Sequence, residues 1–299
     1  MKKNLLKIAI AILPFALNAQ DNEVKTTTYC SPYVGVDFQG TLNTEQTGTA
    51  HKRGNYNAFG TDFDLNVKVE GESKSAVGAT FGFTYGTRWT KQDRKWNPGI
   101  EIDFFHTVGK HKSELSNPEN EEVTNVVGPN KDKVIEFVDE HYGKGHHNFA
   151  NSMTVTSWNT AGNFTLAYMI NEKLAITSAI GLGISAITLK DGESLQTSPA
   201  AADPGYETTK DNGGGAVNHF NTKSDAFSNV LFGQLRFWTK FQFTPKIAWS
   251  LDARGIYRDA TEFTFGSTKY TDHAPTDNWN YSVDKALGYM LTTGIIITL

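Results

Sequence analysis

The sequence predicts an all-β fold, an eight-stranded antiparallel up-and-down transmembrane β-barrel with four long extracellular loops and short periplasmic turns. Three observations predict it. Large apolar residues alternate with small or polar ones along about eight segments of the chain. The connections between these segments are alternately long and short. After the N-terminal region, no run of about 18 apolar residues could form a membrane helix.

The N-terminal region has the pattern of an export signal. Lys2 and Lys3 precede an apolar stretch at 5–17, and Ala19 is a small residue suited to cleavage. This stretch is shorter than the roughly 20 residues that span a bilayer, so a membrane anchor is the less favoured alternative. We expect residues 1–19 to be a signal peptide, 20–32 a short periplasmic N-terminal segment and 33–299 the outer-membrane β-barrel.

Charge and cysteine content exclude several classes of function. The chain has 28 Lys and Arg and 32 Asp and Glu; without Lys2, Lys3 and Lys7 the formal charge is about −7. Such an acidic protein is not expected to bind nucleic acid. A single cysteine, Cys30, allows no internal disulfide framework and no cysteine-rich metal site. We expect no cofactor and no bound metal.

The alternation is clearest in residues 76–89. Phe81, Phe83 and Tyr85 belong to one face, and Gly82 and Thr84 to the other. A soluble sheet or soluble barrel keeps its large residues inside, and glycine is disfavoured within strands. A narrow membrane barrel does the reverse, because its lumen is small and its outside faces hydrocarbon. We therefore assign the small and polar face to the lumen.

The remaining strands follow the same division. They are predicted around 34–38, 100–104, 164–168, 174–184, 231–243, 249–257 and 287–299. The long connections fall at 43–73, 112–150, 190–222 and 266–282, and the short ones at 90–98, 171–173 and 244–246. Strict alternation of this kind is typical of a barrel with surface loops at one end and periplasmic turns at the other. The last strand should pair with the first, near 33–40, and close the barrel.

The sequence resembles the small eight-stranded outer-membrane barrels, a group that includes the OmpA transmembrane domain, OmpX and the opacity-type surface proteins. The first strand "YVGVDFQG", the strand "AVGATFGFTYGTRW", the alternating connections and the final strand carry the resemblance. It implies a monomer in the bacterial outer membrane, in contact with outer-membrane lipid and lipopolysaccharide. No peptidoglycan-binding domain is expected after the last strand.

The resemblance also implies how the final strand is used. The barrel assembly machinery is expected to recognise its outward face. That face consists of Tyr289, Leu291, Ile295, Ile297 and Leu299. Such strands commonly end in Phe, so Leu299→Phe is expected to assemble faster.

The resemblance implies a surface protein with a structural or adhesive role, in which the long loops could bind an extracellular ligand. The alternative is a narrow porin for ions or small solutes. A lipid A-modifying enzyme is less favoured: His106 and Ser157 suggest a pair by position only, and no third residue orients the base.

Charged residues on the inward faces are expected to form a salt-bridged network, because unpaired buried charges are costly. A plug that fills the lumen is the favoured reading, and a rearranging gate is the alternative. The expected network consists of Asp37, Arg88, Glu101, Asp103, Arg236, Lys240, Asp252, Arg254 and Arg258.

Three further patterns stand out. Val134, Phe137, Val138 and His141 recur at helical spacing, which predicts a short amphipathic helix packed on the barrel rim or offered to a partner. Imidazoles in and near that segment could bind Zn or Cu at one rim, but no ligand spacing supports a metal site, and we expect a solvated loop around these histidines. They are His106, His111, His141, His146 and His147. Aromatic residues near strand ends suit interfacial girdles, whereas Trp238 shares the inward parity of Arg236.

Overall fold

The structure is a computed structural model, and it describes most of the chain. The described residues are 24–39, 41–52, 62–75, 77–91, 94–116, 122–141, 148–197, 216–222, 226–265, 268–270 and 274–299. The predicted signal peptide at 1–19 lies outside these residues, as do His146 and His147.

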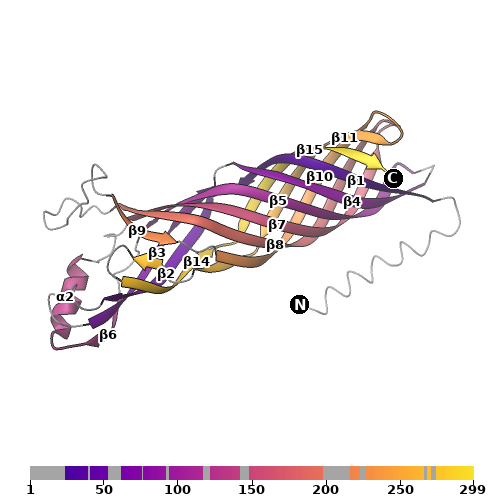
Figure 1. The fold of residues 1–299 in the computed structure, drawn as a ribbon. Helices are drawn as coiled ribbons and strands as arrows, with labels where there is room; N and C mark the ends of the chain where they lie inside the picture. Colours follow the sequence, from indigo (N-terminus) through magenta and orange to yellow (C-terminus); the bar gives the residue numbers. More distant parts are fainter. Residues whose placement is uncertain are drawn as a thin grey trace, which may run out of the picture.

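Eight long strands form a closed antiparallel barrel (Figure 1). Its strands, in chain order, are β1 (Lys25–Gln39), β4 (Gly78–Thr90), β5 (Trp96–Ser116), β7 (Asn148–Met169), β8 (Leu174–Thr197), β10 (Ala226–Gln242), β11 (Ile247–Arg258) and β15 (Ala286–Thr298). Each pairs with the strand before and after it in this series, and β15 pairs with β1 to complete the ring. The predicted fold class is confirmed.

The predicted pairing between β15 and β1 is present. Tyr33 lies opposite Gly294 and Gln39 opposite Gly288. The Leu299 N–H adds a hydrogen bond to the Thr28 carbonyl at 3.0 Å. Because both strands have partners on either side, this seam leaves no unpaired sheet edge in the membrane.

The first strand starts earlier than Tyr33, where the barrel was expected to begin. β1 pairs with β4 from Lys25 opposite Thr90 onward. The earlier start is not evident from the sequence because of Pro32. Proline has no N–H to donate to the ladder, and it usually marks the boundary of a strand. Here Pro32 stays within β1, opposite Phe83 of β4.

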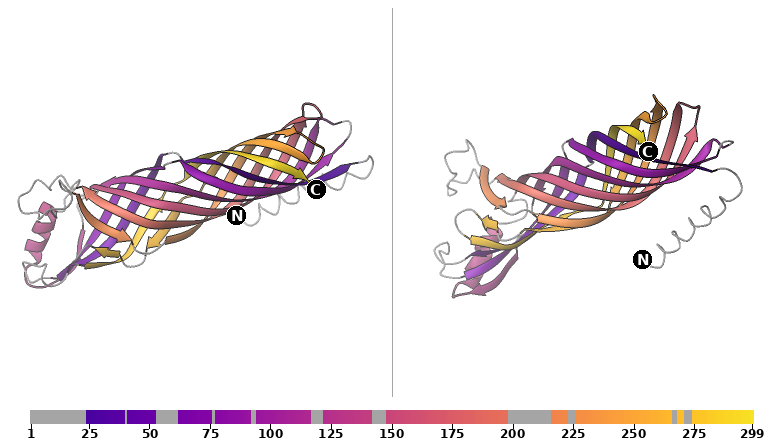
Figure 2. Two further views of the ribbon diagram at one scale, coloured as in Figure 1. Left: turned by 45° about the horizontal axis from the view of Figure 1, so that its top comes forward. Right: turned by 45° about the vertical axis from the view of Figure 1, so that its right-hand side comes forward.

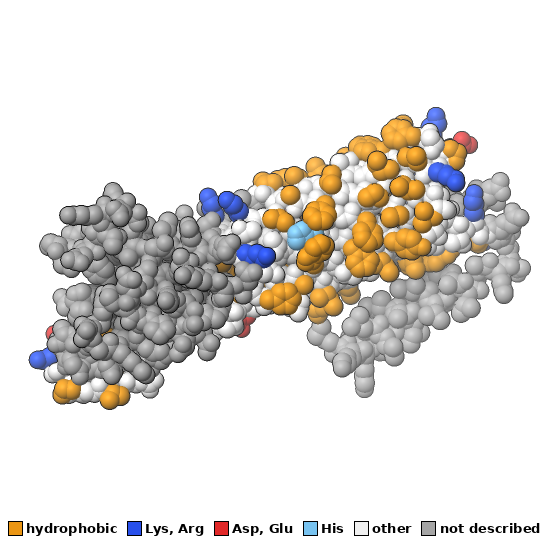
Figure 3. Space-filling model, in the orientation of Figure 1, with side chains coloured by type: hydrophobic (Ala, Val, Ile, Leu, Met, Phe, Trp, Pro, Cys, Tyr) orange, Lys and Arg blue, Asp and Glu red, His pale blue; other side chains and the backbone are white. Residues whose placement is uncertain are grey.

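The outside of the barrel carries a broad apolar belt, orange in Figure 3. Outward side chains such as Phe81, Ile180 and Ile295 are at least half exposed. Aromatic residues mark both margins: Trp96 and Trp249 lie near the short turns, and Trp158 and Tyr257 lie toward the other end. Trp238 points inward, as its parity predicts, and is 5% exposed. Such a belt with aromatic margins matches a lipid bilayer.

At the end opposite the short turns, the ladder continues past the belt as a second closed ring, which we call the distal ring. It combines the far ends of β5, β7 and β8 with five further strands, and the views in Figure 2 show this long continuation. These are β2 (Thr41–Lys52), β3 (Asp62–Ser75), β9 (Ala216–Thr222), β13 (Thr268–Tyr270) and β14 (Ala274–Val283). β6 (Glu122–Val127) pairs with β3, and β12 (Thr261–Phe265) with β14.

The long connections expected at this end therefore contain strands in place of open loops. A change in the hydrophobic pattern explains it. On β8, Ile184 faces outward, but beyond it Ile187 and Leu189 face inward and Lys190 faces outward. A strand that leaves lipid for water needs its apolar residues inside, so the distal ring follows the rule of a soluble barrel.

The predicted amphipathic helix is present as α2 (Lys131–His141). Its Val134 is fully buried, while Ile135 remains 37% exposed. Within the described part of the chain, no helix has the length and apolar character needed to cross a membrane.

Candidate functional site

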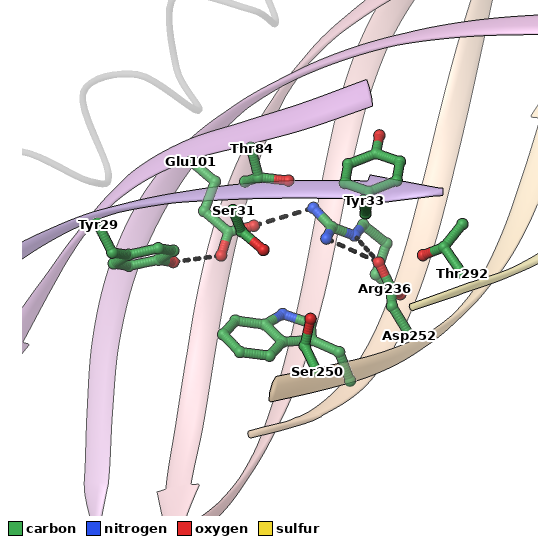
Figure 4. A pocket seen from close by; sticks show the side chains of 10 residues that line it. Tyr29, Ser31, Tyr33, Thr84, Glu101, Arg236, Ser250, Asp252 and Thr292 are labelled. Atoms are coloured by element: carbon green, nitrogen blue, oxygen red, sulfur yellow. Dashed lines mark hydrogen bonds and ion pairs between the residues drawn. The ribbon is translucent and has the colours of Figure 1, made fainter. Parts of the chain in front are cut away.

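Two arginines and three acids meet in the middle of the lumen. Figure 4 shows Arg236 between Glu101 and Asp252. The Arg236 guanidinium donates from Nη1 to Glu101 Oε2 at 3.0 Å, and from Nε and Nη2 to Asp252 Oδ2 at 3.1 and 2.8 Å. Arg254 lies beside it, with Nη1 2.5 Å from Asp103 Oδ2 and Nε 2.9 Å from Asp252 Oδ2. We call these five residues the central network.

Hydroxyl groups donate further hydrogen bonds to the carboxylates of the central network. Tyr29 donates to Glu101, and Tyr33 donates to Asp103 Oδ1 at 2.8 Å. Thr84 donates to the same Asp103 oxygen at 3.0 Å. Because the central network has three carboxylates for two guanidiniums, these neutral donors help to stabilise the extra negative charge away from water.

Apolar layers cover the central network on both sides. Toward the distal ring, Phe105, Phe232, Ile256 and Met290 form a buried cluster that includes the Tyr33 ring. Toward the short turns, Tyr29, Trp238, Ala248 and Ile296 form another. Such layers keep bulk water from the charged groups and strengthen their interactions.

Little space remains beside the central network. The cavity there has a volume of about 10 Å³ and is lined by network residues together with Ser31 and Thr292. That is room for about one water molecule. At this level the lumen is filled by side chains, as expected for eight strands.

The nine charged residues predicted for the lumen fall into three groups. Five make the central network. Arg88 lies nearer the short turns, where its guanidinium sits over the rings of Tyr29 and Trp238, and half-buried Lys240 lies on the same side. Asp37 and Arg258 lie toward the distal ring, and both are buried.

The sequence reasoning missed Tyr29, Tyr33 and Thr84 as members of the site. The alternation along β1 could have identified the two tyrosines. Counting back from Asp37 in steps of two along the inward face reaches Gly35, Tyr33 and then Tyr29. Setting the start of the barrel at Tyr33 left Tyr29 outside it.

His106 and Ser157 do not form a pair. His106 is on the outside of the wall, where its ring packs 4.3 Å from the Trp158 ring and 5.1 Å from Phe81. Ser157 is buried in the lumen, 2.6 Å from Thr107 Oγ1. Neighbouring residues of a strand point to opposite faces, so the sheet itself separates the two side chains.

Among the remaining histidines, His111 has a defined environment. It is buried in the distal ring, with Nε2 2.8 Å from the Tyr281 hydroxyl. The flanking Lys110 and Lys112 face outward past the apolar belt, so His111 lies outside the membrane. Burial lowers the pKa of its imidazole to about 4, which keeps it neutral. No group of three potential ligands among the described residues could hold a metal ion.

Comparison with known proteins gives only distant structural likenesses. No family model and no curated protein matches the sequence. Among solved structures, the outer membrane protein OprG from Pseudomonas aeruginosa is 8% identical, with a TM-score of 0.40 over 92% of this chain and 98% of its own. The outer membrane protease OmpT from Escherichia coli is 7% identical, with a TM-score of 0.36 over 91% and 97%. Neisserial surface protein A is 9% identical, with a TM-score of 0.30 over 86% and 98%.

Such low identities and scores carry no conclusion about function. The closed ring, the apolar belt outside and the charged lumen are observations on this chain itself. The fold is that of a bacterial outer-membrane β-barrel. Only a closed barrel can pair every backbone group of its strands within lipid.

Proposed function

We propose that this protein is a surface protein of the outer membrane with a closed lumen, and that the distal ring and α2 carry a structural and adhesive role. The observation that supports it is the central network. Five buried charged groups pair across the lumen, and only about 10 Å³ of space remains beside them. A barrel filled in this way serves as an anchor for what it carries outside the membrane.

The alternative is a narrow porin for ions or small solutes. It would require Arg236 to leave Glu101 and Asp252, and separating buried ion pairs without new partners is strongly unfavourable. Planar-bilayer recording on the refolded mature protein tests this. We expect a silent membrane up to the voltage at which an empty bilayer breaks. Discrete conductance steps, absent from a mock-refolded sample, would establish the pore.

The adhesive role assigns binding to the region around β6 and α2, where Val127 is 70% exposed. Ser116 and Asn148 lie opposite each other in the β5–β7 ladder. Replacing 117–147 by Asn-Gly should therefore close a two-residue hairpin and leave the barrel intact.

Attachment of cells that display this variant, to abiotic surfaces and to one another, should fall to the level of cells without the protein. The matched control replaces 171–173 in a short turn at the other end and should attach normally. Equal attachment by both variants, at equal surface amounts, would remove the adhesive role.

Contact with lipopolysaccharide is proposed from a row of outward side chains at the belt margin. Thr154 of β7 is flanked by Lys110 of β5 and Lys190 of β8. Ammonium groups at this height suit the phosphates of a lipid headgroup. The double variant Lys110→Ser with Lys190→Ser should retain less lipopolysaccharide in native mass spectrometry, whereas Lys246→Ser, at a short turn, should retain the wild-type amount.

Recognition by the assembly machinery is proposed for β15. Its outward residues Tyr289, Leu291, Ile295 and Ile297, and Leu299 after it, are all exposed and form one continuous face. Leu299→Phe should assemble faster in a membrane-insertion assay, and Leu287→Phe, on the same face near the start of β15, should not.

The protein is proposed to act as a monomer, for which light scattering in detergent is the test.

A further inference from the structure

A second cavity lies between the apolar belt and the distal ring. Its volume is about 60 Å³, several times that of the cavity beside the central network. Its polar lining includes Thr107, Ser157, His111, Tyr281 and Arg258. We call this space the distal cavity.

Arg258 is the decisive group in the distal cavity. Its side chain is 6% exposed, yet neither Nε nor Nη2 has a hydrogen-bond partner among the described residues. These two nitrogens form one edge of the guanidinium, with two parallel N–H groups. Leaving such donors unpaired away from water is unfavourable, so the edge is suited to an acceptor that enters the cavity.

Arg236 provides an example of what this edge of a guanidinium can bind. Arg236 uses its own Nε and Nη2 to hold the Asp252 carboxylate, at 3.1 and 2.8 Å. Two parallel N–H groups match the two oxygens, or one shared oxygen, of a carboxylate. Asp37 interacts electrostatically with Arg258 but leaves this edge unoccupied.

The rest of the distal cavity is mostly apolar. Ile187 and Leu189 of β8, Val230 of β10 and Phe263 of β12 line it, and all four are buried. His111 and Tyr281 are joined by their hydrogen bond on one side. An occupant that suits these walls has an apolar body and one polar end.

Charge at the opening restricts the occupant further. Asp259 and Asp284 line the cavity and are themselves exposed, so they mark its solvent side. Two carboxylates at the opening, together with Asp37 beside Arg258, repel an anion of charge −2 more strongly than a monoanion. Inorganic phosphate is therefore a poorer occupant than a monoanion.

We propose that the distal cavity binds a small monocarboxylate, with its carboxylate on the Nε and Nη2 edge of Arg258 and its short hydrocarbon part against Ile187, Leu189 and Phe263. The volume admits about four to six non-hydrogen atoms, which corresponds to acetate through butyrate. This site is separate from the proposed adhesive surface and does not depend on it.

Isothermal titration calorimetry tests the site with butyrate as the probe and the full mature protein in lipid nanodiscs. We expect saturable one-to-one binding by the wild type, no binding of butan-1-ol, and binding of inorganic phosphate at least tenfold weaker than that of butyrate. Arg258→Gln should weaken butyrate binding at least tenfold, because the paired N–H edge and its charge are lost.

Val230→Phe provides a second, independent variant. It leaves Arg258 in place and fills the cavity from β10, and it should also abolish butyrate binding. If Arg258→Gln does not fold, judged by the heat-dependent gel shift of folded barrels, Val230→Phe alone decides. Absence of binding by the wild type at 50 mM butyrate, or unchanged binding by a folded variant, would overturn the proposal, as would tighter binding of phosphate than of butyrate.

Discussion

Arg254 and Asp103 meet in the middle of the barrel, 151 residues apart in the chain, with Nη1 2.5 Å from Oδ2. Both side chains are fully buried. The ion pair joins β11 to β5, strands that are not neighbours in the ring. The lumen is thus held together by charge in the place where a soluble protein would use an apolar core.

Removing one partner of this ion pair should be costly. Arg254→Met leaves Asp103 and Asp252 with a lost partner in a dry environment, and we expect a loss of about 3 to 5 kcal/mol in the free energy of unfolding. Urea titration of the protein folded into lipid vesicles measures it. Lys285→Ala is the control, because its 3.8 Å ion pair with Asp259 is exposed and should contribute little. Equal effects of both variants would contradict the account of the central network.

A glycine on the lumen side of β8 tests how closely the wall is packed. A Cβ at Gly181 would meet Asn163 Oδ1 and the Gly162 carbonyl. Asn163 cannot readily move, since it accepts a 2.6 Å hydrogen bond from Gln234. Gly181→Ala should therefore destabilise the barrel by about 1 to 3 kcal/mol in the same urea titration.

Gly255→Ala is the matched control, because nothing lies within 4 Å of a Cβ built there. It should leave the free energy of unfolding unchanged or slightly higher, since alanine loses less backbone freedom on folding. If Gly181→Ala behaved in the same way, the close approach of β7 and β8 would be disproved.

His111 should make the distal ring sensitive to acid. The folded pKa of about 4 lies below the ordinary value of 6.5, so the unfolded chain binds the proton more readily between these values. Stability is therefore fully present above pH 6.5 and is lost as the pH falls toward 4. The expected loss is about 2 kcal/mol between pH 7 and pH 5.

Hydrogen exchange at pH 7 and pH 5, corrected for intrinsic rates, measures this effect. Amides of β14 should open more readily at pH 5, while those of β11 should not change. In His111→Gln, which can still bond Tyr281 but does not titrate, the difference in β14 should vanish. A difference that persists in this variant would assign the acid response to another group.

The fold could be predicted well because large apolar residues alternate with small or polar ones along every membrane-spanning strand of such a barrel. Parity alone gave the inward direction of Glu101, Asp103 and Arg236. It could not give their partners. Whether Arg236 meets Glu101 depends on strand tilt and stagger around the ring, which set the height of each side chain in the lumen and leave no trace in a single strand.

The distal ring was not predicted for a related reason. Ile187 and Leu189 point inward on the strand that sends Ile184 outward, so the hydrophobic pattern reverses within a few residues. A search for apolar residues on a single face therefore detects no strand beyond this point. The polar, glycine-rich composition of 43–73 and 190–222 then suggests loops, although most of β2 and β3 and all of β9 fall within these segments.

That reversal also fixes the depth at which β8 sits in the membrane. If β8 slipped by one residue, Ile184 would turn into the polar lumen and Leu189 would turn out into water, so the same error would be unfavourable in two solvents. A slip of two residues keeps the faces but moves Lys190 by about 7 Å, to the level of the hydrocarbon. How far this part of the protein stands out of the membrane is thus encoded along β8 itself.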